Sequence, residues 1–119
     1  MTDRELLELA AKAIGRAEAK FEDGEWLELR YGYKIAMWHD DFDNYWNPLE
    51  SNADAFALAV KLRIHIEWAF TQHGEPEIVQ ASPKGRGHCA DFQALGDKPY
   101  AATRRAITRA AAEIGKGMP

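Results

Sequence analysis

The stretch LRIHIEWAF at residues 62–70 constrains the fold more than any other part of the sequence. Apolar residues take every second position from Leu62 to Phe70, and Arg63, His65 and Glu67 lie between them. Successive side chains of a strand point to opposite faces of a sheet, so this pattern predicts a strand with one apolar and one polar face. The fold must therefore contain a sheet, and the rest of the chain has to provide what packs on it.

Three other segments repeat apolar residues with the period of an α-helix. Thr2 and Glu5 form a capping-box pair that marks the start of the first helix. Pro99 suits the first turn of the third helix, which we expect to end at Gly115 or Gly117. The predicted helices and their apolar faces are residues 2–20 with Leu6, Leu9, Ala10, Ala13, Ile14 and Ala17; residues 52–61 with Phe56, Ala59 and Val60; and residues 99–116 with Ile107, Ala110, Ala111 and Ile114.

Further strands are expected between these helices. EWLELRY alternates like a strand, KIAMWH is apolar as in a strand covered on both faces, and Gly32 between them indicates a tight hairpin. The turn sequence PKG at residues 83–85 separates two weaker candidates. The four stretches are EWLELRY at 25–31, KIAMWH at 34–39, EIVQAS at 77–82 and RGHCADF at 86–92.

The expected elements follow the order α-β-β-α-β-β-β-α. Their number and the length of 119 residues suit a single domain that spans residues 1–119. Short connections and hairpin turns favour a mainly antiparallel sheet of about five strands with three helices packed on it, which is an α+β layer fold.

Charge and composition exclude several classes of protein. The net charge of −4 argues against a dedicated nucleic-acid binder, although it leaves room for a local basic patch. No segment approaches the roughly 18–20 apolar residues of a membrane helix, so we expect no membrane partner. The N-terminal residues interleave charges with apolar residues, unlike a signal peptide, and the single Cys89 fits a reducing compartment. We therefore expect a cytoplasmic protein.

The most acidic cluster is HDDFDN at residues 39–44. His39, Asp40, Asp41 and Asp43 offer an imidazole and hard oxygen ligands that suit a divalent cation. The cluster lacks the glycine and the closing glutamate of a calcium loop, and Asp and Asn are also favoured in solvated turns. The turn interpretation is preferred, so neither a metal site nor a cofactor is expected. The sequence also contains no GxSxG, P-loop, GxGxxG or HExxH motif, and we assign no catalytic residues.

Two further groups of residues are candidates for binding. Lys98, Arg104, Arg105 and Arg109 form a basic segment that would suit phosphates or an acidic partner, or simply the solvated face of a packing helix. Aromatic residues are dense in the first half of the chain. Of these, Phe42, Tyr45 and Trp46 fall in an expected loop, where exposed rings would mark a partner surface.

A longer stretch, WNPLESNADAFALAVKL at residues 46–62, resembles a signature of the phage ABA sandwich family, W-N-P-L-x-D-D-G-D-A-x-x-L-A-x-x-L. The first residues, MTDRELLELAAKAIG, and the last, AATRRAITRAAAEIGKGMP, are similar to the head and tail of the same proteins. Ser51, Asn52 and Ala53 replace the family's D-D-G, which removes two acids from any cation site there. The matching residues are Trp46, Asn47, Pro48, Leu49, Asp54, Ala55, Leu58, Ala59 and Leu62.

The resemblance implies a three-layer α/β/α sandwich of phage or prophage origin with no established activity. Every matched position also has an architectural explanation, with Ser51 and Asp54 as a cap pair and Trp46 and Leu49 as a hydrophobic staple. The first hypothesis is a non-enzymatic accessory protein that binds a phage or host protein in a bacterial cytoplasm. The alternatives are a nucleic-acid-associated phage factor that uses the basic segment, and a small metal-dependent enzyme around His39. A homo-oligomer is compatible with each of them.

Overall fold

Four helices and six strands are present in the part of the chain that the structure, a computed structural model, describes: residues 1–70, 74, 76–83, 91–94 and 96–119. In chain order the elements are α1 (Asp3–Ala13), β1 (Phe21–Asp23), α2 (Glu25–Tyr31), β2 (Ile35–His39), β3 (Asn44–Trp46), α3 (Asn52–Leu62), β4 (His65–Phe70), β5 (Pro76–Ser82), β6 (Asp91–Ala94) and α4 (Pro99–Lys116).

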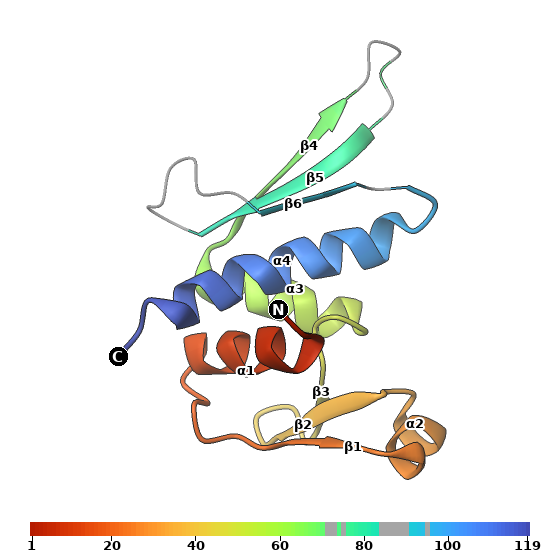
Figure 1. The fold of residues 1–119 in the computed structure, drawn as a ribbon, viewed down its shortest axis with the longest axis vertical. Helices are drawn as coiled ribbons and strands as arrows, with labels where there is room; N and C mark the ends of the chain where they lie inside the picture. The colour runs from red at the N-terminus through yellow and green to blue at the C-terminus, as the bar shows by residue number, and fades with distance from the viewer. Residues whose placement is uncertain (71–73, 75, 84–90, 95) are drawn as a thin grey trace.

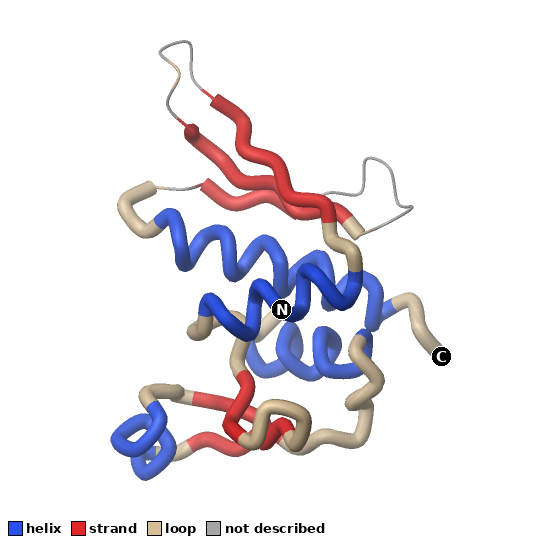
Figure 2. Tube along the Cα trace, turned by 180° about the vertical axis from the view of Figure 1, so that it is seen from behind, coloured by secondary structure: helices blue, strands red, loops and turns tan. Residues whose placement is uncertain are grey.

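The strands form two separate antiparallel sheets. Sheet A has the order β1-β2-β3, and sheet B has the order β4-β5-β6. Helices α1, α3 and α4 lie between the two sheets, and α2 lies beside sheet A at the end of the molecule farthest from sheet B (Figure 1). The view from behind shows the same order (Figure 2). The α+β class is confirmed, but the arrangement differs from the single five-stranded sheet and from the α/β/α layering that the resemblance implies.

The core fills the space between the helical layer and the inner faces of the sheets. Sheet A contributes Phe21, Met37 and Trp46, and sheet B contributes Val79 and Ala81. The remaining buried apolar residues of the core are Leu7, Ala10 and Ala11 of α1, Leu49, Ala55, Leu58, Ala59 and Ile64 of α3 and its flanking segments, and Ala106, Ile107, Ala110 and Ala111 of α4. One apolar interior thus joins both sheets through the helices.

Gly115 sets the distance between α1 and α4. A Cβ atom on this residue would lie 2.0 Å from the backbone oxygen of Leu9, so only glycine allows the two helices to come this close. Gly115 is therefore a packing residue inside α4, and the helix ends with Gly117 as its C-cap, one of the two ends that the sequence predicts.

The sequence predicts the long helices and three strands well. Helix α4 spans the predicted residues 99–116, α3 spans 52–62, and β2, β4 and β5 lie within or near the predicted stretches. Helix α1 is shorter than the prediction, since it ends at Ala13 and Gly15 adopts a left-handed φ of +87°. The predicted strand 86–92 lies outside the described residues except at its end, where β6 begins at Asp91.

The prediction was wrong for EWLELRY, which forms α2 instead of a strand. Gly24 and Gly32 bound this short helix, and Gly32 closes it with a left-handed φ of +82° instead of forming a hairpin. Only Leu27 of the helix is buried, so the apparent period-2 alternation did not reflect a buried sheet face. The short strands β1 and β3 were not predicted, because three residues carry no readable period. None of the described helices is long and apolar enough to cross a membrane.

Candidate functional site

Four aromatic side chains on the outer side of sheet A form one surface, which we call the aromatic patch: Trp26, Tyr31, Trp38 and Tyr45. Tyr45 lies at its centre. Its ring centroid is 4.7 Å from Tyr31, 5.4 Å from Trp38 and 5.9 Å from Trp26, each in an edge-to-face arrangement. Edge-to-face pairs at these distances contribute about 0.5–1.5 kcal/mol each beyond the area they bury. The patch is therefore held in place by its own ring contacts.

The register of sheet A and the packing of α2 against it bring these rings together. Trp38 of β2 is the direct cross-strand partner of Tyr45 of β3, so both side chains project from the same face. Met37 and Trp46, their neighbours in sequence, point to the opposite face and are buried. Helix α2 adds Trp26 and Tyr31, and its buried Leu27 anchors it next to β1 and β2.

Charged groups surround the patch and act on two of its rings. The Tyr45 hydroxyl donates a 2.7 Å hydrogen bond to Oε2 of Glu22. This bond stabilises the protonated phenol and raises the pKa of Tyr45 from 10.0 to about 12. The guanidinium of Arg30 lies 5.9 Å from the centre of the Tyr31 ring, within the range of a cation–π contact.

The patch is open to solvent. Trp26 is 50% exposed and Trp38 is 45% exposed, although both are large apolar side chains. Leu29 on the same short helix is more exposed still. Rigid aromatic rings in a partly exposed group are the side chains that most often anchor protein interfaces. The arrangement can therefore bind a partner by apolar and ring contacts.

The structure separates the three aromatic residues that the sequence marks as a partner surface. Tyr45 belongs to the aromatic patch. Trp46 is only 1% exposed and lies in the core against Phe21, so its assignment to a surface was wrong. The two are consecutive residues of β3, which places them on opposite faces of sheet A. Phe42 is exposed but stacks on His39, on the turn that joins β2 and β3.

The residues of the acidic cluster contact other groups instead of gathering as metal ligands. His39 is buried, and its Nδ1 accepts a hydrogen bond from the backbone amide of Asp41. Desolvation, and next the nearby Arg16, lower the pKa of His39, so the ring is neutral around pH 7. Asp40 and Asp41 pair with Arg16 at 3.8 and 3.3 Å. Across the described residues, no three His, Cys, Asp or Glu side chains group in a way that suits a metal ion.

The residues that carry the family resemblance have structural roles. Trp46, Asn47, Pro48 and Leu49 are all buried. The Asn47 side chain donates to the backbone oxygen of Ile35 at 2.6 Å and accepts from the amide of Leu49 at 2.8 Å. These bonds satisfy a buried amide and fix the turn between β3 and α3. The motif therefore builds the fold and exposes no reactive group.

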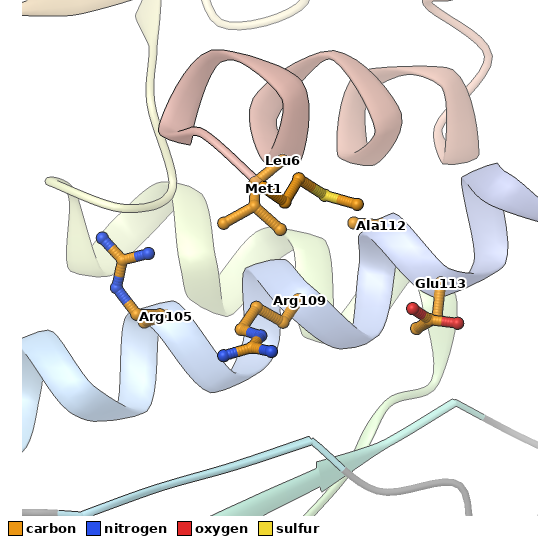
Figure 3. Close-up of a pocket in the computed structure, with 6 residues that line it drawn as sticks. All are labelled: Met1, Leu6, Arg105, Arg109, Ala112 and Glu113. Atoms are coloured by element: carbon orange, nitrogen blue, oxygen red, sulfur yellow. The ribbon is translucent and has the colours of Figure 1, made fainter.

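Two arginines of the basic segment, Arg104 and Arg105, form contacts within the chain. Arg104 donates to the backbone oxygen of Leu49 at 2.9 Å and to Oδ1 of Asn52 at 2.7 Å. Arg105 forms a 3.0 Å ion pair with Asp3. Figure 3 shows Arg105 and Arg109 on α4 beside Met1 and Leu6, around a pocket of about 160 Å³ that Glu113 also lines.

Arg104 and Arg105 thus contact different parts of the chain. Arg104 lines a second, apolar pocket with residues of α3, whereas Arg105 faces α1. Lys98 is exposed at the N-cap of α4. The described structure therefore does not gather the four cations on one face, as a phosphate-binding surface would require.

Sequence reasoning missed three of the four residues of the aromatic patch: Trp26, Tyr31 and Trp38. The density of aromatic residues was visible, but reading residues 25–31 as a strand put Trp26 and Tyr31 on opposite faces. A helix with a glycine at each end was the signal that could have found them. The pairing of Trp38 with Tyr45 was not readable, because it depends on the unpredicted strand β3.

Comparisons with known proteins do not indicate what this surface binds. The chain matches no protein-family model, no curated protein and no solved structure. The aromatic patch is therefore interpreted from its own geometry.

Proposed function

We propose that this protein is a non-enzymatic binding domain that recognises another protein through the aromatic patch. The observation that carries the proposal is the exposure of Trp26 and Trp38 in a ring cluster centred on Tyr45. Burying apolar surface stabilises a protein by about 25 cal/mol per Å². The half-exposed Trp26 and Trp38 do not contribute this free energy in the isolated chain. A partner that covers them recovers that free energy.

The rigidity of the patch supports the same proposal. Tyr45 is restrained by three ring contacts and by its hydrogen bond to Glu22. Side chains that are already ordered lose little conformational entropy on binding, so more of the contact energy appears as affinity. Glu22 and Arg30 at the rim supply polar groups that would orient the partner.

The resemblance to the phage ABA sandwich family supports a phage or prophage accessory protein, with a phage or host protein as the partner in a bacterial cytoplasm. A nucleic-acid partner is less well supported, because Arg104 and Arg105 are engaged in tertiary contacts. A metal-dependent enzyme is the least supported, because His39 is buried and its Nδ1 already accepts a backbone amide.

Affinity capture with a matched pair of variants tests the proposal. The Trp26→Ser, Trp38→Ser double variant removes the exposed part of the patch, and Phe42→Ser removes an exposed ring elsewhere. Lysates of phage-infected bacteria are passed over each immobilised protein, and captured proteins are identified. We expect a protein that the wild type and Phe42→Ser retain and the double variant loses by at least about tenfold.

Circular dichroism and urea unfolding must first show that the double variant is folded. A partner that all three proteins capture equally contradicts the proposal, as does a wild type that captures none. Fluorescence titration with the purified partner then gives the dissociation constants directly, since the emission of Trp26 and Trp38 changes when the partner covers them.

A further inference from the structure

Strand β4 is an edge strand whose apolar face is poorly covered. Among the described residues it pairs only with β5, so its other edge carries unpaired backbone groups. Where helix α4 packs on sheet B, it contacts β5 and β6. Trp68 is consequently 46% exposed and Phe70 is 62% exposed, although they continue the alternating apolar positions Leu62, Ile64 and Ile66.

Helix α3 continues this apolar surface next to the start of β4. Phe56 is 71% exposed and Val60 is 47% exposed, and both border a hollow that Ile64, His65 and Ile66 also line. A second hollow of about 270 Å³ connects Phe56 with Ile66 and with Tyr100 of α4. Apolar side chains of α3, α4 and β4 thus line adjoining hollows, and Trp68 lies two residues after Ile66, on the same face of β4. We call these residues the β4 edge surface: Phe56, Val60, Ile66, Trp68 and Tyr100.

Natural edge strands are normally protected against pairing by lysine, by proline or by covering elements. Strand β4, with the sequence HIEWAF, contains neither lysine nor proline. Its only irregularity is a register shift against β5 between Ala69 and Phe70, at the far end of the strand. The first half of β4, next to α3, is therefore regular and open.

The charges of β4 are complementary to a second copy of the same strand. In an antiparallel pair related by a two-fold axis normal to the sheet, directly opposite residues project from the same face. His65 Nε2 already lies 2.5 Å from Oε1 of Glu67 in its own chain. Centring the axis on Ile66 also places each His65 opposite Glu67 of the other copy, so imidazoles and carboxylates alternate across the pair. Centring it on Glu67 would oppose two carboxylates, which is destabilising. Centring it on Trp68 would draw the register shift at Ala69 into the pairing.

We propose that this protein forms a two-fold symmetric homodimer by antiparallel pairing of β4 with β4, centred on Ile66. The two sheets B join into one six-stranded sheet, and Phe56, Val60 and Trp68 of both copies pack around the axis. The same two-fold operation pairs the open backbone edge, covers the exposed apolar side chains and brings the His65–Glu67 pairs of the two copies together. Strand β4 and sheet A lie at opposite ends of the molecule, with the helical layer between them (Figure 1), so the β4 pairing leaves the aromatic patch of sheet A accessible.

Disulfide trapping tests the register. Cysteines at directly opposite positions can bridge, whereas Cα atoms more than about 7 Å apart cannot. In a Cys89→Ser background, which removes the only native cysteine, Ile66→Cys is compared with Glu67→Cys. We expect Ile66→Cys to form a disulfide-linked dimer under mild oxidation and Glu67→Cys to remain monomeric. Efficient linkage of Glu67→Cys without linkage of Ile66→Cys overturns the proposed register.

Sedimentation of the untagged wild-type protein over a range of concentrations tests the dimer itself. We expect the apparent mass to rise from that of a monomer to that of a dimer as the concentration increases. In Phe56→Asp the dissociation constant of the dimer should rise at least about tenfold. Phe56 is mostly exposed, so this variant should fold, and Phe42→Asp serves as the matched control on another surface. A wild-type protein that stays monomeric while Ile66→Cys fails to link overturns the proposal, as does a monomer that instead binds an unrelated extended peptide along β4.

Discussion

The backbone amide of Asn47 donates a 2.9 Å hydrogen bond to Oδ2 of Asp54. The bond joins the residue after β3 to the first turn of α3, and Ser51 at the N-cap of α3 accepts from the amide of Asp54 at 3.2 Å. Together these contacts hold sheet A against the helical layer. They come at a cost, because burial raises the pKa of the Asp54 carboxyl.

Two substitutions of Asp54 test this contact, because one removes the acceptor oxygen and the other keeps it. Asp54→Ala leaves the buried amide of Asn47 without an acceptor, so we expect the free energy of unfolding to fall by about 1–3 kcal/mol. Asp54→Asn keeps an acceptor oxygen and removes the desolvated charge, so its stability should stay close to wild type. Urea unfolding near pH 7 measures both. Equal losses in the two variants would show that the charge itself, and not the accepted hydrogen bond, stabilises the turn.

A second prediction concerns the pH dependence of stability. Desolvation, with Arg16 next, lowers the pKa of His39 below 6.5, so the unfolded chain binds the proton more readily than the folded one. The stability contributed by the neutral ring is complete above about pH 6.5 and is lost as the pH falls through the folded-state pKa. Asp41 and Asp54 oppose this shift, whereas Lys61 adds to it.

Urea unfolding at several pH values between about 5 and 8 measures this dependence. His39→Asn supplies an oxygen in place of Nδ1 and cannot titrate, so its stability should vary less with pH over that range. An unchanged slope in His39→Asn would mean that other groups determine the acid sensitivity.

A third prediction concerns the phenol at the centre of the aromatic patch. The hydrogen bond to Glu22 raises the pKa of Tyr45 to about 12, so Glu22→Gln should lower that pKa toward the ordinary 10.0. Ultraviolet absorbance of tyrosinate, compared between each protein and its Tyr45→Phe counterpart, isolates the titration of this ring. Glu28→Gln on α2 is the control. A titration that does not move in Glu22→Gln would show that ring packing, not the carboxylate, holds the proton.

A fourth prediction concerns the contact between α1 and α4. Alanine normally stabilises a helix interior by up to about 1 kcal/mol relative to glycine. At Gly115 the new methyl group would overlap the backbone oxygen of Leu9, so Gly115→Ala should instead destabilise the protein by about 1–3 kcal/mol. Gly117→Ala, at an exposed αR cap, should change stability by less than about 0.5 kcal/mol. A Gly115→Ala protein as stable as wild type would mean that the helices move apart freely.

The elements that the sequence predicted are those whose ends and faces depend on local chemistry. Pro99 and Gly117 mark the ends of α4, and Thr2 caps α1 through its side chain as the sequence indicated. Ser51 likewise caps α3. Such signals act within one helical turn, so they are readable without knowing what packs nearby. The alternating stretch around His65 predicted β4 for the same reason.

The errors have one physical origin, since each required knowing a distant neighbour. Residues 25–31 alternate like a strand, but Gly24 and Gly32 bound them as the short helix α2, which packs beside β1 and β2. Of the predicted apolar face of α3, only Ala59 is buried, together with Ala55 and Leu58, whereas Phe56 and Val60 are exposed. Periodicity shows which residues lie together, but only packing decides which side is covered.

By itself, the sequence determined the α+β class, the helical segments, the antiparallel strands around residues 65–82 and the architectural nature of the motif at residues 46–49. The tertiary structure alone decided that the helices lie between two sheets, that Trp46 is buried while Tyr45 is half-buried in a ring cluster on the other face of sheet A, and that Gly115 lets α1 meet α4. Helix caps and hydrophobic periodicity depend on residues a few positions apart. Surfaces depend on strand register and on how helices pack, which bring together residues far apart in the chain.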